Sequence, residues 1–483
     1  MRFSIIQRLV GVLLMLFSIT QVPPFLLDLF YDEHAKMAFF YSYVVLLVLG
    51  LIMYLPVRKI RGDLRLRDGF MVVVLFWSVL GMAGALPLVF YNPLSASFTD
   101  AVFESISGLT TTGATVLTGL DALPHSILFY RQELQWLGGM GIIVLAVAVM
   151  PMLGIGGMQL YRAEAPGPVK DSKLTPRIAE TAKALWYTYL GLTIACTLAF
   201  WAAGMNLFDA VGHSFSTLST GGFSTHDASL AYFHSPVIES IAIVFMFLGG
   251  VNFALHYGAM RSKSLLHYIR DSEFLMYSTT LLIASVSIII CFYIEYPAYD
   301  LVDSIRHGLF NVISMATTTG FTTTPFSAWP PFIPVTLILV GFMGGCGGST
   351  GGGMKAIRLL LLIKQGQREL MRLIHPNALV VVKLGKKPMS ETVIESVWGF
   401  FAAYIASFVI MMLMMMFTGT DQVTAFSAVA STMNNVGPGL GAVSVNYAGL
   451  SDFNKWVLVF SMLLGRLEVF TLLVMFMPAF WRK

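Results

Sequence analysis

The chain has 483 residues, of which 56% are hydrophobic and only 12% are charged, with a formal net charge of +4. A soluble domain carries about 25% charged residues, so a soluble fold could not bury this much apolar surface, and disordered, collagen-like and coiled-coil chains are excluded as well. The three cysteines all lie in apolar stretches, which excludes a disulfide scaffold.

Ten segments along the chain are apolar enough to cross a bilayer as helices, which takes about 20 residues each. They are predicted at residues 4–27, 36–57, 70–92, 132–158, 181–204, 236–260, 275–296, 331–343 (resuming after a break), 393–418 and 455–481. All exceed the roughly ten alternating residues of a membrane β-strand. The chain is therefore predicted to be an all-α polytopic membrane protein whose main partner is the lipid bilayer.

Basic residues gather on one side of the predicted membrane. All 30 Lys and Arg residues except Lys36, Arg131, Arg306, Lys455 and Arg466 lie in segments that share the side of the N-terminus. Because basic loops stay in the cytoplasm, both termini are predicted to be cytoplasmic. Most of the 26 acidic residues lie on the outer side or within the membrane. There they would attract cations, although acids could also simply fill loops that orientation leaves unconstrained.

Four connections on the outer side share one pattern. Segments 100–115, 209–224, 307–322 and 424–439 align with a glycine in register and a serine six residues before it. The glycines are Gly113, Gly222, Gly320 and Gly437, and the serines are Ser107, Ser216, Ser314 and Ser431. In each copy a spanning helix precedes a semi-apolar stretch that is too short to cross the bilayer, and a second spanning helix follows. The short stretch and its loop must enter the membrane from outside and return, which places four loops around one axis.

The composition of these loops suggests what they do. Backbone carbonyls of Thr/Gly loops can replace the hydration shell of a cation, and the C-terminal end of the preceding short helix adds a favourable negative dipole. Such non-helical backbone persists inside a membrane only where it is buried in protein or lines a wet cavity. One Thr/Gly loop alone would more simply be an ordinary turn, but four in register favour a cation-binding ring.

The second helix of the third copy is interrupted by seven glycines, each costing about 1 kcal/mol in a helix. They are Gly344, Gly345, Gly347, Gly348, Gly351, Gly352 and Gly353. We predict a non-helical loop there, at mid-membrane depth below the ring. Arg466 lies in an apolar span, where an arginine needs a partner or water. It is predicted to face the pore as a barrier to cations, the alternative being an ion pair with Glu468. Lys355 ends the run and either adds positive charge or anchors the cytoplasmic end.

Two cytoplasmic stretches, 162–183 and 356–391, are long and basic. The second begins with an amphipathic helix that could lie on anionic lipid or dock a cytosolic protein. Nucleic-acid binding is disfavoured because membrane topology already explains the basic residues. A phosphate-binding P-loop is disfavoured as well, since residues 353–356 lack the Gly-Lys-Ser/Thr order that it requires.

Several motifs together resemble one family. SGLTTTGAT, STLSTGGFST, MATTTGFTT and NNVGPGLG resemble the four filter loops of the Trk/Ktr/HKT superfamily of K⁺ transporters. The resemblance covers nearly the whole chain: YRAEAPGPVKDSK (161–173), TPRIAETAK (175–183), GGCGGSTGGGMK (344–355), GRLEVFTLL (465–473) and the extra N-terminal helix pair are similar to the membrane subunit of bacterial Trk uptake systems.

The resemblance implies a K⁺-channel-like fold of four repeats, each an outer helix, a pore loop and an inner helix. Its divisions would be residues 1–69 for the N-terminal helix pair and 70–160, 161–262, 263–376 and 377–483 for the repeats. It also implies that K⁺ is the transported ion and that backbone carbonyls bind it. These carbonyls would belong to Thr111, Thr112, Gly113, Thr220, Gly221, Gly222, Thr318, Thr319, Gly320, Asn435, Val436 and Gly437.

In this superfamily a serine replacing the first-loop glycine is linked to Na⁺ transport, so glycine at all four positions favours K⁺. The fourth loop departs most from the pattern, since Asn434, Asn435 and Pro438 replace threonine-rich sequence. The resemblance further implies a homodimer in the bacterial inner membrane, and a TrkA-like cytosolic nucleotide-binding subunit that regulates it. In the family the intramembrane loop is thought to obstruct the permeation path.

The first functional hypothesis is K⁺ uptake through the ring, gated by the glycine loop and Arg466, with no covalent reaction and no organic cofactor. A second hypothesis keeps the fold but couples K⁺ to H⁺ or Na⁺ in a symporter. A remote third is a membrane enzyme or respiratory-chain subunit, which would usually require haem ligands, metal sites or chains of buried acids that the sequence does not present.

Overall fold

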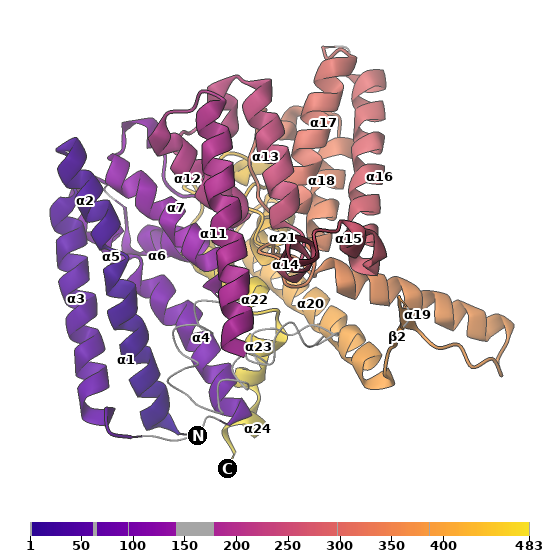
Figure 1. Cartoon of the computed structure of the whole chain (residues 1–483), viewed down its shortest axis with the longest axis horizontal. Coiled ribbons are helices and arrows are strands. Elements are labelled where there is room, and N and C mark those ends of the chain that lie inside the picture. Colours follow the sequence, from indigo (N-terminus) through magenta and orange to yellow (C-terminus); the bar gives the residue numbers. More distant parts are fainter. Residues whose placement is uncertain are drawn as a thin grey trace.

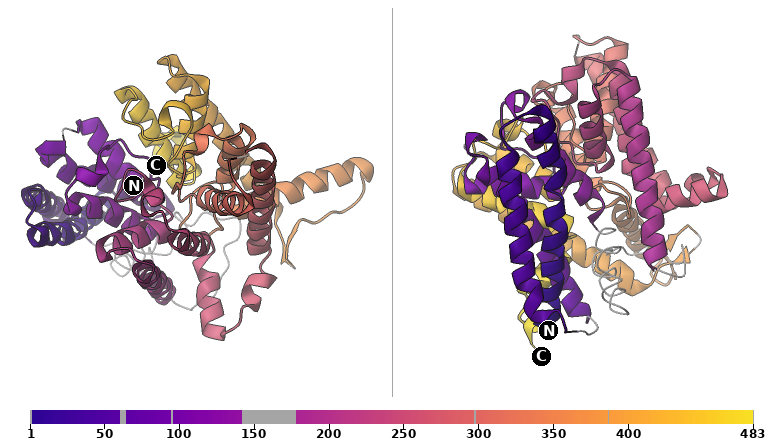
Figure 2. Two further views of the ribbon diagram at one scale, coloured as in Figure 1. Left: turned by 90° about the horizontal axis from the view of Figure 1, so that it is seen from above. Right: turned by 60° about the vertical axis from the view of Figure 1, so that its left-hand side comes forward.

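The computed structural model describes residues 2–60, 65–94, 96–141, 178–296, 298–385 and 387–482. Within them the chain forms a bundle of helices, and both termini lie at the same end of it (Figure 1). Seen from above, successive parts of the chain that follow the N-terminal helices are arranged in order around a common centre (Figure 2). This arrangement brings segments far apart in sequence to the middle of the molecule.

The N-terminal helices α1 (Phe3–Ile19) and α3 (Lys36–Tyr54) pack closely along their length. Glycines make the close approach possible, because a Cβ on Gly11 would lie 2.9 Å from the carbonyl oxygen of Gly50. Between them lies α2 (Val22–Tyr31), which has proline in its first turn, where the missing N–H costs least. Together α1 and α2 make the first candidate span.

The rest of the described chain repeats one order of elements: a long helix, a short helix, a loop and a second helix. The bounds are α4 Leu66–Ala83, α5 Leu86–Phe90, α6 Phe98–Leu109 and α7 His125–Gly139; then α11 Ile178–Ala202, α12 Leu207–Leu218, α13 Pro236–Gly249, α14 Phe253–Ser262 and α15 Leu266–Arg270; then α16 Ser272–Glu295, α17 Leu301–Ala316, α18 Phe332–Met343 and α19 Ala356–Ile374; then α20 Glu391–Phe417, α21 Gln422–Met433, α22 Asp452–Arg466, α23 Phe470–Leu473 and α24 Pro478–Trp481. A small antiparallel pair, β1 (Lys383–Leu384) and β2 (Lys387–Pro388), follows α19.

Six described helices are long and apolar enough to span a membrane, or up to eight candidate spans if two bent pairs each count as one. In both bent pairs a predicted span, 236–260 or 455–481, is divided into two helices that meet at a sharp angle. The first bends by 97° between α13 and α14, where Asn252 caps the new helix by accepting the N–H of Ala254 at 2.8 Å. The second bends by 108° at Glu468 and Val469, whose φ angles are positive. The predicted span end at 158, the boundary at 160–161 and the 161–173 motif lie outside the described residues.

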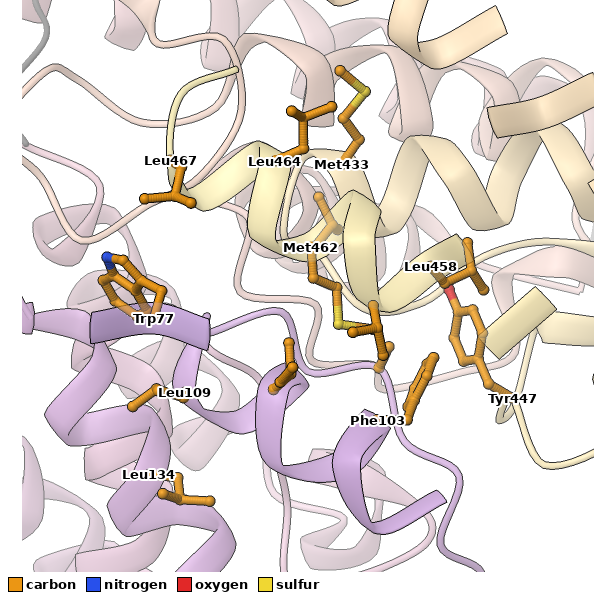
Figure 3. Packing of buried hydrophobic residues seen from close by; sticks show 14 of the residues in the cluster. Trp77, Phe103, Leu109, Leu134, Met433, Tyr447, Leu458, Met462, Leu464 and Leu467 are labelled. Carbon is orange, nitrogen blue, oxygen red and sulfur yellow. The ribbon is translucent and has the colours of Figure 1, made fainter. Parts of the chain in front are cut away.

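A buried apolar cluster joins the beginning of the chain to its end. Figure 3 shows Trp77 of α4 and Phe103 of α6 on one side and Met462 of α22 and Tyr447 on the other. The rings of Phe103 and Tyr447 are 5.5 Å apart at an angle of 38°, a favourable aromatic contact. Packing here closes the circle of helices, so that the first and fourth copies of the pattern are neighbours.

Candidate ion site and gate

The four short helices α6, α12, α17 and α21 start in the same way. In each, the residue before the helix accepts a hydrogen bond through its side-chain oxygen from the backbone N–H three residues later. These caps are Ser97, Asn206, Asp300 and Asp421, with distances of 3.1, 2.7, 2.8 and 3.0 Å. Such caps typically contribute about 1 kcal/mol each, so the four helices have defined starts.

The four helices also end in the same way. The residue that ends each helix is followed by one with positive φ: Thr111 (58°), Thr220 (54°), Thr318 (63°) and Asn435 (54°). The next N–H then reaches back to the carbonyl oxygen of the in-register serine, Ser107, Ser216, Ser314 or Ser431, at 2.8 Å in every case. This is the Schellman end of a helix. The serine register seen in the sequence therefore marks a backbone contact, whose form sequence reasoning did not foresee.

Two residues beyond each of these positions stands the in-register glycine, again with positive φ: Gly113 (79°), Gly222 (78°), Gly320 (78°) and Gly437 (100°). The residue between has negative φ in all four loops. Alternation of this kind aligns successive N–H groups on one side of the backbone, and so leaves the carbonyls on the other. Each loop can thus present a row of carbonyl oxygens.

Contacts between the loops close into a ring. A Cβ on Gly113 would lie 2.1 Å from the carbonyl oxygen of Gly221 in the second loop. A Cβ on Gly222 would lie 1.8 Å from the carbonyl oxygen of Thr319, and a Cβ on Gly320 would lie 1.9 Å from the carbonyl oxygen of Val436. A Cβ on Gly437 would lie 2.8 Å from the carbonyl oxygen of Thr112, which belongs to the first loop. Each glycine therefore makes room for a carbonyl of the next loop, and the order is cyclic.

Two of the predicted ligand carbonyls also accept hydrogen bonds from side chains. Gln135 Nε2 donates to the carbonyl oxygen of Gly221 at 2.6 Å, and Tyr447 Oη donates to that of Gly437 at 2.7 Å. A carbonyl oxygen has two lone pairs, so each retains capacity for a second partner. These bonds fix the positions of the two carbonyls, and nothing in the sequence pattern pointed to Gln135 or Tyr447.

The departures in the fourth loop have a structural reason. Asn435 Nδ2 donates to Thr112 Oγ1 at 2.8 Å and to the carbonyl oxygen of Met462 at 3.1 Å, so this side chain ties the fourth loop to the first and to α22. Asparagine also tolerates the left-handed conformation better than threonine. Asn434 Oδ1 accepts a hydrogen bond from Tyr404 Oη at 2.7 Å. In the fourth loop, the side-chain amides of Asn434 and Asn435 form the hydrogen bonds that hold the loop, a role that hydroxyl groups have in the first and third loops.

Glycines on the second helices allow those helices to touch the loops. A Cβ on Gly138 would lie 1.8 Å from the carbonyl oxygen of Leu109, and one on Gly465 would lie 2.1 Å from that of Met433. A Cβ on Gly250 would lie 3.2 Å from the Thr317 methyl group. Glycine at these three positions therefore allows a close approach between helix and loop.

A buried ion pair links the outer parts of the first and second loops. Arg131 Nε and Glu104 Oε1 are 2.7 Å apart, and both side chains are only 1% exposed. Glu104 also accepts the N–H of Val116 at 2.9 Å, while Arg131 Nη1 donates to the carbonyl oxygen of Ser224 at 3.1 Å. The guanidinium lies 4.2 Å above the Phe223 ring. The pair thus joins α6 and α7 to both loops.

We expect Glu104→Gln and Arg131→Met each to destabilise the protein by about 3–5 kcal/mol, because each leaves a buried charge without its partner. The double variant should lose less stability than the sum of the losses in the two single variants. Thermal unfolding of purified protein in detergent measures this. The exposed pair Arg372–Glu369 is the control, since its removal should cost less than about 1 kcal/mol. Single variants at 104 and 131 that melt like the wild type would contradict the assignment.

The glycine-rich segment 344–355 lies against three of the loops. Thr350 Oγ1 donates to the carbonyl oxygen of Leu218 at 2.9 Å, which is at the end of α12. The N–H of Gly352 donates to Thr318 Oγ1 at 2.7 Å, and the N–H of Gly353 to the carbonyl oxygen of Asn434 at 3.0 Å. Lys355 Nζ donates to the carbonyl oxygen of Gly351. A Cβ on Gly352 would lie 2.2 Å from the Asn434 carbonyl oxygen, so glycine is required for this contact.

Arg466 connects this segment to the remaining loop. Its Nη1 donates to Thr111 Oγ1 at 3.2 Å and to the carbonyl oxygen of Thr350 at 3.0 Å, and its Nη2 donates to the carbonyl oxygen of Gly138 at 2.6 Å. Glu468, considered above as its partner, forms an ion pair with Arg358 of α19. Arg466 and segment 344–355 together contact all four loops.

The outer side of the ring carries an acidic cluster around His226. Its Nδ1 is 2.5 Å from Asp121 Oδ1 and its Nε2 is 3.3 Å from Asp209 Oδ2, and Tyr232 stacks on the ring. Burial lowers the pKa of His226, but the hydrogen bonds to Asp209 and Asp121 outweigh it, so this pKa is raised above its ordinary value. The imidazolium therefore ties two outer loops together.

Because the pKa of His226 is raised on folding, its contribution to stability should be complete below about pH 6.5 and should be lost as pH rises through the raised value. We expect His226→Gln to lower the melting temperature at pH 6 and to change it little at pH 9. Melting curves of purified protein across this range test the prediction, with the exposed outer His34→Gln as control. Equal losses at both pH values would contradict it.

No group of three or more His, Cys, Asp and Glu side chains suited to a metal ion occurs within the described residues. The candidate ligands of the ring are backbone carbonyls, which the sequence could indicate only through the glycines and threonines beside them. Positions in the ring, in segment 344–355 and at Arg466 all come together at the centre of the bundle.

Comparisons with known proteins identify the family. The TrkH family of cation transport proteins matches residues 35–483. The chain is 54% identical to the Trk system potassium uptake protein TrkH of Halomonas elongata and 53% identical to that of Escherichia coli K12, with 100% of each chain covered. The crystal structure of the potassium transporter TrkH from Vibrio parahaemolyticus matches it with a TM-score of 0.91 at 51% identity, covering 100% of both chains. The chain belongs to the TrkH family of cation transport proteins.

Proposed function

We propose that this protein takes up K⁺ across the bacterial inner membrane through the ring of four loops, without a covalent reaction and without an organic cofactor. The observation that carries the proposal is the cyclic set of contacts in which each in-register glycine accommodates a carbonyl of the next loop. A closed ring of backbone oxygens is the arrangement that replaces the water around a monovalent cation. The names of the Halomonas and Escherichia relatives, which are potassium uptake proteins, support K⁺ as that cation.

The ligands in this proposal are the backbone carbonyls of the three residues that end at each in-register glycine. The four loops share their φ pattern and their helix ends, which supports equivalent roles for the four sets. The bonds from Gln135 and Tyr447 would fix the spacing of the ring, and spacing decides which ion replaces its water best. Each set belongs to one of the four pore repeats, 70–160, 161–262, 263–376 and 377–483, and residues 1–69 form the additional helix pair.

Segment 344–355 and Arg466 form the gate of the proposed pathway. The segment is bound to the inner side of three loops, and Arg466 places a positive charge beside the first, where it would repel an entering cation. Lys355 adds charge at the same level. Opening requires the hydrogen bonds between segment and loops to be exchanged for others, so the closed state has a definite set of contacts that a regulator could break.

The proposed orientation has both termini in the cytoplasm, and their position at one end of the bundle supports this (Figure 1). The far end of α19 projects sideways from the bundle (Figure 1), with exposed apolar residues such as Leu370 and Leu373 beside its basic ones. This surface is suited to a cytosolic partner, and we assign it to a TrkA-like nucleotide-binding subunit that acts on a homodimer of this chain.

Expression in a bacterial strain without K⁺ uptake systems of its own tests the function. We expect growth at low external K⁺ and accumulation of K⁺ in the cells. A chain with intact ring glycines that accumulates Na⁺ but not K⁺ under these conditions would overturn the proposal. A variant with Gly222→Ala serves as the negative control, because its Cβ would meet a carbonyl oxygen at 1.8 Å.

A further inference from the structure

The start of α19 lacks a cap of its own. The residue before the helix is Lys355, which has a φ of 73° and makes no side-chain bond to the first turn. A carboxylate from another helix takes that place: Glu273 Oε1, near the start of α16, accepts the N–H of Ile357 at 3.1 Å. A negative charge at a helix N-terminus is favourable, and here it comes from a separate element.

The same carboxylate oxygen binds the glycine-rich segment. Glu273 Oε1 accepts the N–H of Gly347 at 2.6 Å, ten positions before Ile357. A carboxyl oxygen has lone pairs for both of these donors. One half-buried side chain thus holds both the beginning of the segment and the helix that follows it.

The remainder of the segment is fixed at the ring, through Thr350, Gly352 and Gly353 as described above. The N–H of Cys346 also donates to the carbonyl oxygen of Gly250 at 2.8 Å. The segment is therefore held at its inner face by Glu273 and at its outer face by the loops. The first turns of α19 stay packed, with Arg358 paired to Glu468, and the far end of the helix projects outward (Figure 1), where a partner could pull on it.

We propose that Glu273 is a positioning residue that couples α19 to the gate. Displacement of α19 withdraws the N–H of Ile357 from the carboxylate, and the N–H of Gly347 shares that carboxylate, so the segment loses its inner support together with the helix. A displacement of α19 also reaches the segment directly, because Ala356 follows Lys355 in the chain, and Glu273 adds a second connection to Gly347. The inference rests on the proposed function of segment 344–355 as the gate.

A native cysteine makes the coupling measurable. Cys346 lies within the segment and is buried, and the chain contains only two other cysteines. In the full-length protein carrying Cys196→Ala and Cys291→Ala, modification of Cys346 by a small charged thiol reagent reports opening of the segment. Glu273→Gln keeps the side-chain shape but replaces the carboxyl group with an amide, and Glu273→Asp shortens the side chain by one methylene.

We expect Glu273→Gln to accelerate labelling of Cys346 and basal K⁺ flux about tenfold, equivalent to about 1.4 kcal/mol, with the K⁺/Na⁺ permeability ratio unchanged. Glu273→Asp should have a smaller effect in the same direction. The control is Glu295→Gln at the exposed far end of α16, which should match the wild type. A purely structural role would instead lower flux and selectivity together, and that result would overturn the proposal.

Arg466→Ala, measured in parallel, separates this inference from the function beneath it. If Arg466→Ala raises basal flux while Glu273→Gln leaves both labelling and flux at the wild-type level, the coupling is wrong and the gate stands. If neither variant raises flux although both proteins are folded, the assignment of the gate is wrong, and the proposed coupling is then wrong as well.

Discussion

Gly113→Ser is expected to lower the K⁺/Na⁺ permeability ratio by about tenfold or more. The left-handed backbone at Gly113 costs a residue with a side chain about 1–2 kcal/mol. The new Cβ would also lie 2.1 Å from the carbonyl oxygen of Gly221, so that carbonyl must move. A shift worth 1.4 kcal/mol between two ions changes their ratio about tenfold. Zero-current potentials with K⁺ on one side of the membrane and Na⁺ on the other measure the ratio.

Gly119→Ser is the matched control for this prediction. Gly119 follows the same loop and also has a positive φ, of 69°, but a Cβ there would have no atom within 4 Å. A serine at position 119 would therefore be strained in its backbone but would not collide with another atom. We expect this variant to keep the wild-type K⁺/Na⁺ permeability ratio. A wild-type ratio in Gly113→Ser would remove Gly113 from the ion pathway, and an equal loss in Gly119→Ser would show that strain, rather than the ring, determines the effect.

Arg466→Ala is expected to raise basal K⁺ flux on the order of tenfold to a hundredfold. The guanidinium bridges Thr111, Thr350 and Gly138, and each hydrogen bond from a charged group contributes about 1.5–3 kcal/mol. The substitution removes those bonds together with a positive charge next to the pathway. Flux of a K⁺ tracer into proteoliposomes containing the purified protein measures the change.

Arg466→Lys refines this test, because lysine keeps the charge but cannot donate in three directions with the fixed geometry of a guanidinium. Its flux should fall between those of the wild type and the alanine variant. Arg270→Ala, at an exposed position, is the control for loss of a positive charge elsewhere in the protein. Flux that stays at the wild-type level in Arg466→Ala would contradict a gate built on this residue.

Much of the architecture was predictable because it depends on local patterns in the sequence. Apolar segments long enough to span a bilayer predicted helices, and the in-register glycines marked four positions at which the structure has positive φ. The seven glycines at 344–353 predicted a break, which the structure places between α18 and α19. Each of these features depends on residues close together in the chain, where composition and spacing are sufficient.

Contacts between distant residues were not predictable in this way. Asn435 and Thr112 are 323 positions apart, and a hydrogen bond between them becomes visible only when the ring closes. The Glu104–Arg131 pair and the carboxylate of Glu273 depend likewise on which helix faces which. The bends after α13 and α22 were missed because the surrounding residues are apolar enough for continuous helices. At the first bend Asn252 caps the new helix, and the N–H of Phe253 donates to the carbonyl oxygen of Gly348.

The most direct test of the account is the membrane potential of proteoliposomes that contain only the Arg466→Ala protein, with a K⁺ gradient and with Na⁺ and protons balanced. In the proposed mechanism the ring selects K⁺ and the gate is weakened in this variant, so the potential should develop without a partner and approach the K⁺ equilibrium value. A potential that stays near zero until a proton or Na⁺ gradient is added would contradict a K⁺-selective pore and would indicate coupled transport on the same fold.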